Sequence, residues 1–590
     1  MNKYQTLVNI LDKIRVEATA PYKKRYLPSE LEIEKINQAR ARSFIHLYLK
    51  VSFGLLEFGE REHYITDDPY DGGIDGYFIN KENRTIYFIQ SKFRTNGKNF
   101  EGKEITLEEV LIMDINRILN GEEKDESGNE YNGKIKQLQR EISNVDNIAR
   151  YSYNVIILAN LTGVPDSKLR QLTGGYATSV FDYEKCYEAL IFPVISGTFF
   201  NASDVNIYID LSNKNAGSKI SYTVKTKHSE CDITVLFVPT IEVAKILHKY
   251  KNSILKFNPR SFLELEGQKV ISAMRETILN NSTNEFALFN NGITMISDET
   301  NINEKIGQKN KAQLNVRNPQ IINGGQTTYT LSRIYEENLT NNPETIFQDK
   351  EVLLKIITLN DSSGNQNNEI QKLQLIDDIS TATNLQTPVI TADKFSNERT
   401  PILLQKILFE RFGILFERKR GEFGDGLNNG YIHKNQILER NLFFRIYCAS
   451  NGEINKAIEK RIFMSKALED GILNDSTKLD NFYFGLKCFK RISTSSNPQK
   501  SKHKYIYAQI YAFTKINKPS NVDDYDDVVN KNIGTFKKAW SDFEKQKSKE
   551  NTKFIRNYID KETQTPRQAF NEKSWYRSLE FEKDVLSYFK

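Results

Sequence analysis

The sequence predicts an α/β protein with a helical C-terminal region. Apolar residues recur at helical spacing over residues 29–58, and strand-like segments follow at 74–80 and 85–93. Patterns of strand and helix alternate again from about residue 230 to about 440. Residues 441–590 have mostly the pattern of amphipathic helices, with many Tyr and Phe.

The bulk composition excludes several protein classes. A chain of 590 residues is too long for one hydrophobic core, so we expect about two to four domains. The balance of 82 basic and 76 acidic residues gives +6, which permits nucleic-acid binding without arguing for it. The four cysteines are far apart, which disfavours a disulfide framework or a cysteine-rich zinc site. The first twenty residues carry charges throughout, and no apolar run approaches a membrane span, so we expect a cytoplasmic protein.

The first 165 residues have the pattern of one compact α/β unit. The helix at 29–58 is expected to start near Ser29 and to end at Gly59. Further elements are expected as helices at 106–120 and 133–148 and as a buried strand at 153–161. We therefore expect a domain at 1–165.

The rest of the chain divides into two further expected regions. Strand-like pieces occur at 190–196 and 205–211 within a turn-rich stretch. An α/β or α+β region is expected over 166–440, and a mostly helical region over 441–590. The last region contains the basic loop "STSSNPQKSKHK".

Polar residues gather at the ends of the first two strands. Alternation places Gln90 and Lys92 on one face of the second strand, about 7 Å apart. A short hairpin would bring Asp75, at the start of the preceding strand, alongside them. A buried lysine needs an acidic or phosphate partner. One carboxylate, one amide oxygen and one lysine therefore predict a site for phosphodiester hydrolysis.

The expected chemistry uses a hard divalent cation, Mg²⁺ or Mn²⁺. Asp75, the side-chain oxygen of Gln90 and a backbone carbonyl near Ser91 are suitable ligands. The metal would polarise the phosphate and activate a bound water, and Lys92 would orient that water and offset developing charge. The alternative is a hairpin with a surface lysine pair and a turn aspartate.

This arrangement resembles a known nuclease superfamily. "GIDG" followed by "IQSK" is similar to the D…(D/E/Q)-x-K signature of PD-(D/E)xK nucleases, in the Gln variant of Mrr-like restriction enzymes. The resemblance implies a restriction-endonuclease-like N-terminal domain with Asp75, Gln90 and Lys92 as catalytic residues. Many of these enzymes add a glutamate from the preceding helix, but residues 41–56 hold no acid. The candidate substitutes are Glu34, Glu57, Asp68 and Asp71.

Five motifs stand out in the second half of the chain. They are "NPR" with Arg260, "FNNGIT" with Asn291, "INGGQT", "TNLQ" with Asn384, and "ERKRG" with Lys419. In "INGGQT", paired glycines precede a helix, where exposed N–H groups favour an anion and Thr327 or Thr328 is expected to cap. The alternatives are ordinary turns and a solvated basic face. The candidate substrate- or nucleotide-binding residues are Arg260, Asn291, Asn323, Gly324, Gly325, Gln326, Thr327, Asn384 and Lys419.

In this order, the five motifs resemble the AIPR (abortive infection phage resistance) family, whose members commonly carry an N-terminal PD-(D/E)xK-like domain. The resemblance implies a phage-defence protein, and we expect a Mg²⁺-dependent endonuclease acting on DNA. It leaves partner defence proteins and a homo-oligomer open. The alternatives are a ribonuclease and a catalytically degenerate module that binds nucleic acid. The clusters "RTNGKNFEGK" and "KSKHKY" are candidate phosphate contacts.

Overall fold

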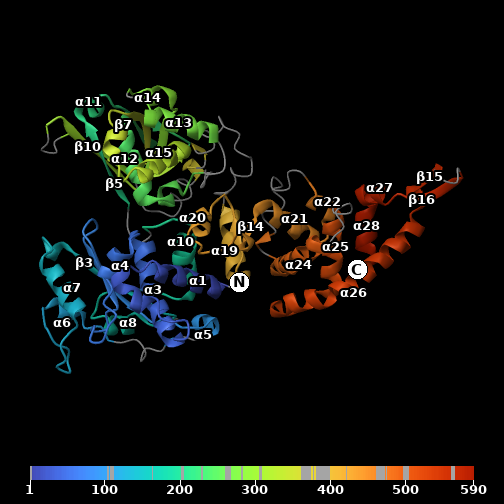
Figure 1. Cartoon of the computed structure of the whole chain (residues 1–590), viewed down its shortest axis with the longest axis horizontal. Helices are drawn as coiled ribbons and strands as arrows, with labels where there is room; N and C mark the ends of the chain where they lie inside the picture. The colour runs from blue at the N-terminus through green and yellow to red at the C-terminus, as the bar shows by residue number, and fades with distance from the viewer. Residues whose placement is uncertain are drawn as a thin grey trace. The chain divides into compact units, whose positions relative to one another are not determined.

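A computed structural model of the chain forms two compact units (Figure 1). Unit 1 comprises Met1–Asn397 and Lys419–Gln436, and unit 2 comprises Glu398–Arg418 and Ile437–Lys590. The structure describes residues 3–102, 105, 112–161, 164–200, 205–227, 230–258, 268–280, 283–304, 309–359, 374–376, 378–379, 399–419, 421–459, 472–473, 475–495, 504–559 and 565–590.

Unit 1 begins with a helical segment, and a four-stranded sheet follows. Its helices before the sheet are α1 (Lys3–Val16), η1 (Ala20–Tyr22), α2 (Lys23–Tyr26), α3 (Ile33–Phe53) and α4 (Phe58–His63). The sheet contains β1 (Gly76–Asn80), β2 (Thr85–Ser91), β3 (Ser152–Leu158) and β4 (Ala177–Phe181) in that order. The intervening and following helices are α5 (Gly97–Gly102), α6 (Ile115–Leu119), α7 (Gly133–Ser143), η2 (Ile148–Arg150), α8 (Asp166–Leu172), α9 (Tyr183–Cys186), η3 (Tyr187–Ile191) and α10 (Phe192–Ser196).

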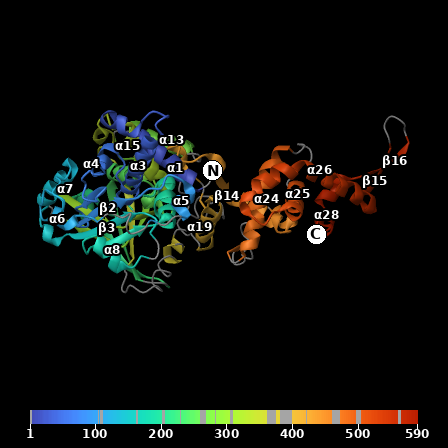
Figure 2. The same cartoon turned by 90° about the horizontal axis from the view of Figure 1, so that it is seen from below.

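Helices cover both faces of this sheet because both faces are apolar. β1 and β2 are antiparallel, whereas β2, β3 and β4 run parallel, with β2 and β3 side by side in Figure 2. On one face Phe88 packs in a core with Leu138 of α7. On the other face Phe53 of α3 stacks on Phe78 at 4.3 Å between ring centroids. The segment predicted as the second strand therefore forms β2, and this strand is buried on both faces.

Several predicted boundaries need correction. The helix predicted at 29–58 is shorter, because α3 begins at Ile33 rather than near Ser29 and ends at a left-handed Gly54 rather than at Gly59. The strand predicted at 190–196 is wrong, because η3 and α10 are helical there and end at a left-handed Gly197. Short apolar runs fit either a buried strand or a buried helix, which explains this error. The helix predicted at 106–120 lies partly outside the described residues, and α6 occupies its end.

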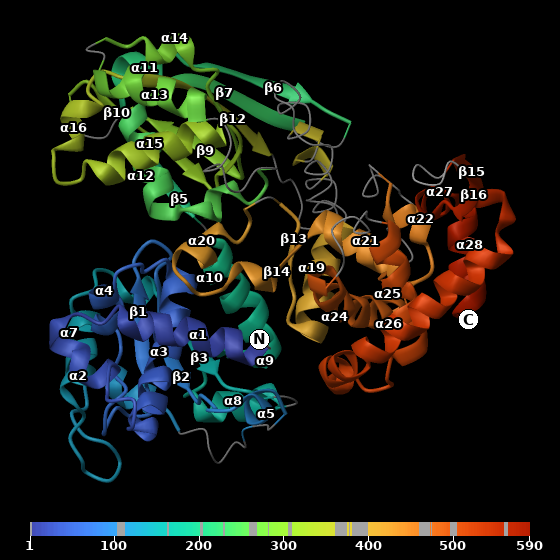
Figure 3. The same cartoon turned by 45° about the vertical axis from the view of Figure 1, so that its right-hand side comes forward.

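The following part of unit 1 is built on two sheets. The three-stranded sheet has the order β5 (Asn206–Ser212), β10 (Lys311–Arg317), β9 (Glu299–Asn303). The five-stranded sheet has the order β11 (Gln320–Asn323), β8 (Ile293–Ser297), β12 (Glu351–Leu359), β7 (Glu230–Pro239), β6 (Ile220–Lys225). Helices α12 (Thr240–Tyr250) and α15 (Gly325–Glu337) lie side by side in Figure 3 and share a core with both sheets. The remaining helices are α11 (Asn213–Gly217), η4 (Asn252–Leu255), α13 (Gln268–Asn280), α14 (Phe286–Phe289), α16 (Pro343–Ile346), α20 (Gly424–Asn428) and η6 (Lys434–Gln436).

Unit 2 is mostly helical, as predicted for the C-terminal region. Its helices are α19 (Arg399–Phe412), α21 (Arg440–Ser450), α22 (Ile454–Ala457), α24 (Ser476–Ser495), α25 (Lys504–Asn517), η9 (Val522–Asp524), α26 (Tyr525–Glu550), η10 (Thr552–Phe554), α27 (Glu572–Arg577) and α28 (Leu579–Tyr588). β13 (Leu415–Glu417) pairs with β14 (Ile437–Glu439), and β15 (Ile555–Ile559) pairs with β16 (Pro566–Phe570). Trp540, Trp575 and Phe581 are fully or almost fully buried in its aromatic core.

Among the residues that the structure describes, none of the helices combines the length and the apolarity that crossing a lipid bilayer needs.

Candidate functional site

The β1–β2 hairpin brings Asp75 to the end of β2, as the sequence predicts. The backbone N–H of Asp75 donates to the carbonyl of Ile89 at 2.8 Å, which extends the ladder by one residue. The Ser91 N–H donates to Oδ2 of Asp75 at 2.6 Å. Asp75 is only 7% exposed. This carboxyl group is therefore fixed beside the last residue of β2.

Two further acids from the preceding loop join Asp75. One carboxylate oxygen each of Asp67, Asp71 and Asp75 lie within 4.8 Å of one another. Asp71 is one of the acids that the sequence offers in place of a helix glutamate, and Asp67 is not. Glu34 and Glu57 are exposed and take no part in this group, and Asp68 turns instead to Arg25 at 2.7 Å. The three aspartates are regularly spaced in the sequence. Regular spacing within a loop, however, does not determine the direction in which the side chains point.

The electrostatics of these carboxyl groups favour a bound cation. Burial raises the pKa of Asp75, and the charges of Asp67 and Asp71 raise it further. Burial likewise raises the pKa of Asp71, with a contribution from Asp67. Lys92 opposes both rises through its charge, so its ammonium group lies within electrostatic reach of the pair. Crowded carboxylates of this kind are stabilised in the ionised form by a nearby positive charge.

Gln90 braces the turn between Asp71 and Asp75. Its side chain is fully buried, and Nε2 donates to the Gly73 carbonyl at 2.9 Å. Gly73 has φ +74, and a Cβ there would lie 2.7 Å from the carbonyl oxygen of Ile112, so the position requires glycine. Its N–H in turn donates to Asp71 Oδ1 at 2.9 Å. Gln90 therefore shapes the loop, and its role as a metal ligand stays a prediction.

The loop that carries the acids is tied to α7. Asn132 caps this helix, with its side chain accepting from Lys134 and Ile135. The same side chain donates to the carbonyl of Thr66 at 3.1 Å. The backbone N–H of Asn132 donates to the carbonyl of Tyr70 at 3.0 Å. The cap of one helix thus fixes the start and the middle of the acidic loop.

The glycine motifs of the second half pack against each other. Gly292 has φ +81 and Gly324 has φ +85, and a Cβ on Gly324 would lie 2.9 Å from the Gly292 carbonyl oxygen. The Asn290 side chain donates to Oγ1 of Thr327 at 3.0 Å and accepts from the N–H of Gly292 at 2.9 Å. "FNNGIT" and "INGGQT" therefore form one structural unit.

The predicted cap of α15 is wrong. The N-cap residue is Gly324, and it makes no side-chain capping hydrogen bond. Thr328 instead donates its hydroxyl back to the Gly324 carbonyl at 2.9 Å. Gly325 starts the helix and is buried, Asn323 and Gln326 are partly exposed, and Asn291 is exposed. Arg260 and Asn384 lie outside the described residues, so the predicted anion site stays a prediction.

Lys419 is a buried structural residue in this region rather than part of a solvated basic face. It is 3% exposed, and Nζ donates to the carbonyl oxygens of Lys256 and Asn258. The Asn258 side chain donates to the Ile321 carbonyl at 3.3 Å. Two motifs that are distant in sequence, "NPR" and "ERKRG", are therefore linked by a hydrogen bond, and "NPR" also bonds to Ile321, the residue before "INGGQT".

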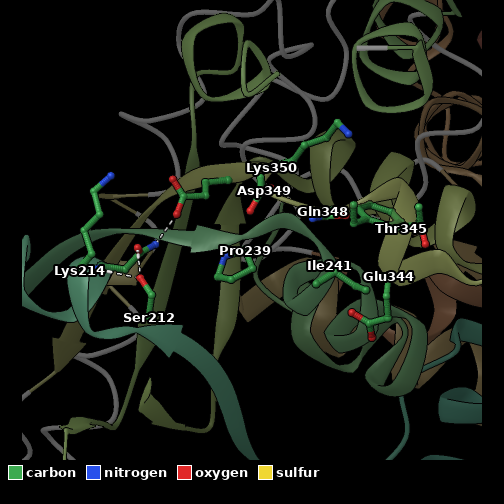
Figure 4. Close-up of a pocket in the computed structure, with 12 residues that line it drawn as sticks. Ser212, Lys214, Pro239, Ile241, Glu344, Thr345, Gln348, Asp349 and Lys350 are labelled. Carbon is green, nitrogen blue, oxygen red and sulfur yellow. Dashed lines mark hydrogen bonds between the residues drawn. The ribbon is translucent and has the colours of Figure 1, made fainter. Parts of the chain in front are cut away.

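A cavity of about 570 Å³ lies away from these motifs. Ser212, Lys214, Pro239, Ile241 and Asp349 are among its lining residues (Figure 4). It contains none of the predicted site residues.

The basic cluster "KSKHKY" is described only at its end, where both residues point inward. Lys504 is buried and donates to the Ser578 carbonyl, and Tyr505 packs in the core of unit 2. In the other cluster, Lys98 of α5 is exposed. The described part of the chain therefore leaves the cluster after β2 as the better candidate for phosphate contacts.

Comparison with protein families matches the motif-bearing part of the chain. The model of the AIPR family, described as "AIPR protein", matches residues 255–553. No curated protein matches the chain. No solved structure matches it either. The family match covers the glycine motifs and Lys419 and extends through α26 of unit 2, and it begins after the acidic site. The chain belongs to the AIPR family.

Proposed function

We propose that this protein defends against phage as a metal-dependent endonuclease that hydrolyses phosphodiester bonds, with DNA as the substrate. Membership of the AIPR family suggests the phage-defence role. The single observation that supports the nuclease is the group of Asp67, Asp71 and Asp75, with carboxylate oxygens within 4.8 Å, beside Lys92. The acids and the lysine come from the two arms of one hairpin and its preceding loop.

The residues present fit a hard divalent cation. Carboxylate oxygens are the ligands that Mg²⁺ and Mn²⁺ prefer. Asp75 and Asp71 would hold the metal, with Asp67 and the side-chain oxygen of Gln90 as further ligands. Such a metal supplies Lewis acidity and lowers the pKa of a bound water.

The chain's own groups would orient the substrate and balance charge. Asp75 is held by the Ser91 N–H, so its carboxylate has one fixed direction. The Lys92 ammonium would contact a non-bridging phosphate oxygen and offset the charge that develops there during attack by water. Lys98, on the exposed face of α5, would contact the phosphate backbone without reading sequence.

Cleavage by the purified full-length protein tests this proposal. Supercoiled plasmid, single-stranded DNA and RNA would be incubated with Mg²⁺, with Mn²⁺ and with EDTA. We expect metal-dependent DNA cleavage that is lost in Asp75→Asn and Lys92→Met. Asp68→Asn is the matched control, because Asp68 lies in the same loop but pairs with Arg25.

The other outcomes decide between the rival functions. Cleavage confined to RNA would make the protein a ribonuclease. If the folded protein binds nucleic acid but cuts none of these substrates, and Asp75→Asn protects cells from phage as well as wild type, the nuclease proposal is wrong and a binding module is favoured.

A further inference from the structure

Arg42 is a buried cation that faces the acidic loop. Its side chain is 7% exposed and comes from α3, the helix that supplies no acid to the site. Nη1 donates to the backbone carbonyl of Asp67, and it lies 3.3 Å from Oδ2 of the same residue. One guanidinium nitrogen therefore holds both the backbone and the side chain of Asp67.

The opposite side of Arg42 is anchored in the core of the domain. Nη2 lies 3.3 Å from Oε1 of Glu62, which is 2% exposed, and Nε donates to the Tyr26 hydroxyl at 3.2 Å. Burial acts to raise the pKa of Glu62, but the hydrogen bond from His46 and the charge of Arg42 outweigh it and lower this pKa. Glu62 is thus an ionised, buried partner that fixes the guanidinium in place.

We propose that Arg42 is a positioning residue that holds Asp67 toward Asp71 and Asp75 and so completes the cation site. This inference rests on the proposed metal-dependent function. In place of a helix glutamate, α3 supplies the cation that orients a carboxylate from the loop. The planar guanidinium suits this task because its nitrogens contact Asp67 and Glu62 at the same time, which a lysine ammonium on one flexible stem does not reproduce.

The physical need for this contact comes from charge repulsion. The Asp67 side chain is 40% exposed, so without Arg42 it would turn toward water and away from two other carboxylates. Groups that orient metal ligands typically change metal affinity by about 10- to 100-fold. We therefore expect Arg42→Met to weaken metal binding within this range.

Calorimetric titration of the full chain with Mn²⁺, in the absence of nucleic acid, tests the proposal. Arg42→Met should raise the Kd for Mn²⁺ by about 10- to 100-fold. Arg25→Met is the matched control, because Arg25 pairs with the neighbouring Asp68 and not with the acid cluster. It should bind Mn²⁺ as wild type does. Equal affinity of folded Arg42→Met and wild type would overturn the proposal.

Removing Arg42 alone leaves Glu62 buried without its cation, so Arg42→Met can fail to fold for this reason only. Two further variants keep the test valid in that case. Arg42→Met/Glu62→Gln removes both charges of the pair and should show the same loss of affinity. Asp67→Asn changes only a partly exposed side chain and should show it too. In the Asp67→Asn background, Arg42→Met should add little, because both changes act through one carboxylate.

The outcomes separate this inference from the proposed function. If folded wild type binds no Mn²⁺, the metal-dependent function fails and the inference falls with it. If wild type binds Mn²⁺ and Asp75→Asn does not, but Asp67→Asn binds as wild type does, the metal site stands and the positioning role of Arg42 is overturned.

Discussion

The ammonium nitrogen of Lys419 donates a 3.0 Å hydrogen bond to the carbonyl oxygen of Asn258, a residue 161 positions earlier in the chain. A second hydrogen bond from the same nitrogen reaches the Lys256 carbonyl at 2.5 Å. Lys419 thus ties the start of the 419–436 segment to the residues that directly follow η4, within the region that the family model matches. Buried carbonyls in irregular backbone need donors, and here a lysine supplies them.

Lys419→Met should destabilise the protein without any ligand being involved. The substitution leaves two carbonyl oxygens without this donor, and a lost buried partner costs about 1–3 kcal/mol. Thermal unfolding followed by circular dichroism measures the effect. Lys434→Met is the control, since Lys434 is exposed in η6. Unchanged thermal stability of Lys419→Met would show that the residue serves binding rather than structure.

Gly324→Ala should disturb the contact between the two glycine motifs. The added Cβ would lie 2.9 Å from the Gly292 carbonyl oxygen, in a backbone with φ +85. We expect a loss of about 1–3 kcal/mol in the free energy of unfolding. Gly217→Ala in α11 is the matched control, because nothing lies within 4 Å of its Cβ position. Equal stability of both variants would contradict the close approach of "FNNGIT" and "INGGQT".

Asp71→Asn should stabilise the metal-free protein and abolish stabilisation by metal. Burial and the neighbouring Asp67 raise the pKa of Asp71, so its ionised form destabilises the fold without a cation. We expect the variant to gain about 1 kcal/mol in EDTA. Wild type should gain stability on addition of Mn²⁺, as any ligand of the native state confers. Thermal scans with EDTA and with Mn²⁺ measure both effects, and a variant that is less stable than wild type in EDTA would refute the repulsion.

His46 should make stability fall as the pH drops below its usual pKa. Burial lowers the pKa of His46 from 6.5 to about 4 despite its hydrogen bond to Glu62. The unfolded chain therefore binds a proton between pH 6.5 and 4 that the native state does not bind. The stabilising effect is complete above pH 6.5, declines by up to about 3 kcal/mol toward pH 4, and then stays constant.

The pH dependence is measured as the difference in melting temperature between wild type and His46→Gln at pH 7.5 and at pH 5. Wild type should lose more stability than the variant between these values. His433→Gln, at an exposed position, should follow wild type. If His46→Gln loses as much stability as wild type on acidification, the histidine is not buried in its neutral form.

The hairpin of the candidate site could be predicted from the sequence, but the contacts that orient its acidic side chains could not. Alternation along β2 and the short turn fix the register that brings Asp75 beside Ser91, so this proximity could be predicted. The direction of Asp67 could not, because a loop has no period that assigns its side chains to a face. The role of Arg42 could not be predicted for another reason. A single arginine in a helical pattern looks like an ordinary surface residue.

What the sequence determined by itself is local: the strands and helices of α/β character, the carboxylate, glutamine and lysine at the ends of one hairpin, and the ordered motifs of the family. Only the tertiary structure decided that Lys419 supports "NPR", that Gly324 approaches Gly292, and that Arg42 holds Asp67. The physical reason is the sequence separation over which each kind of interaction acts. Propensity and periodicity act between residues a few positions apart, whereas burial and charge pairing depend on which distant segments the hydrophobic core brings together.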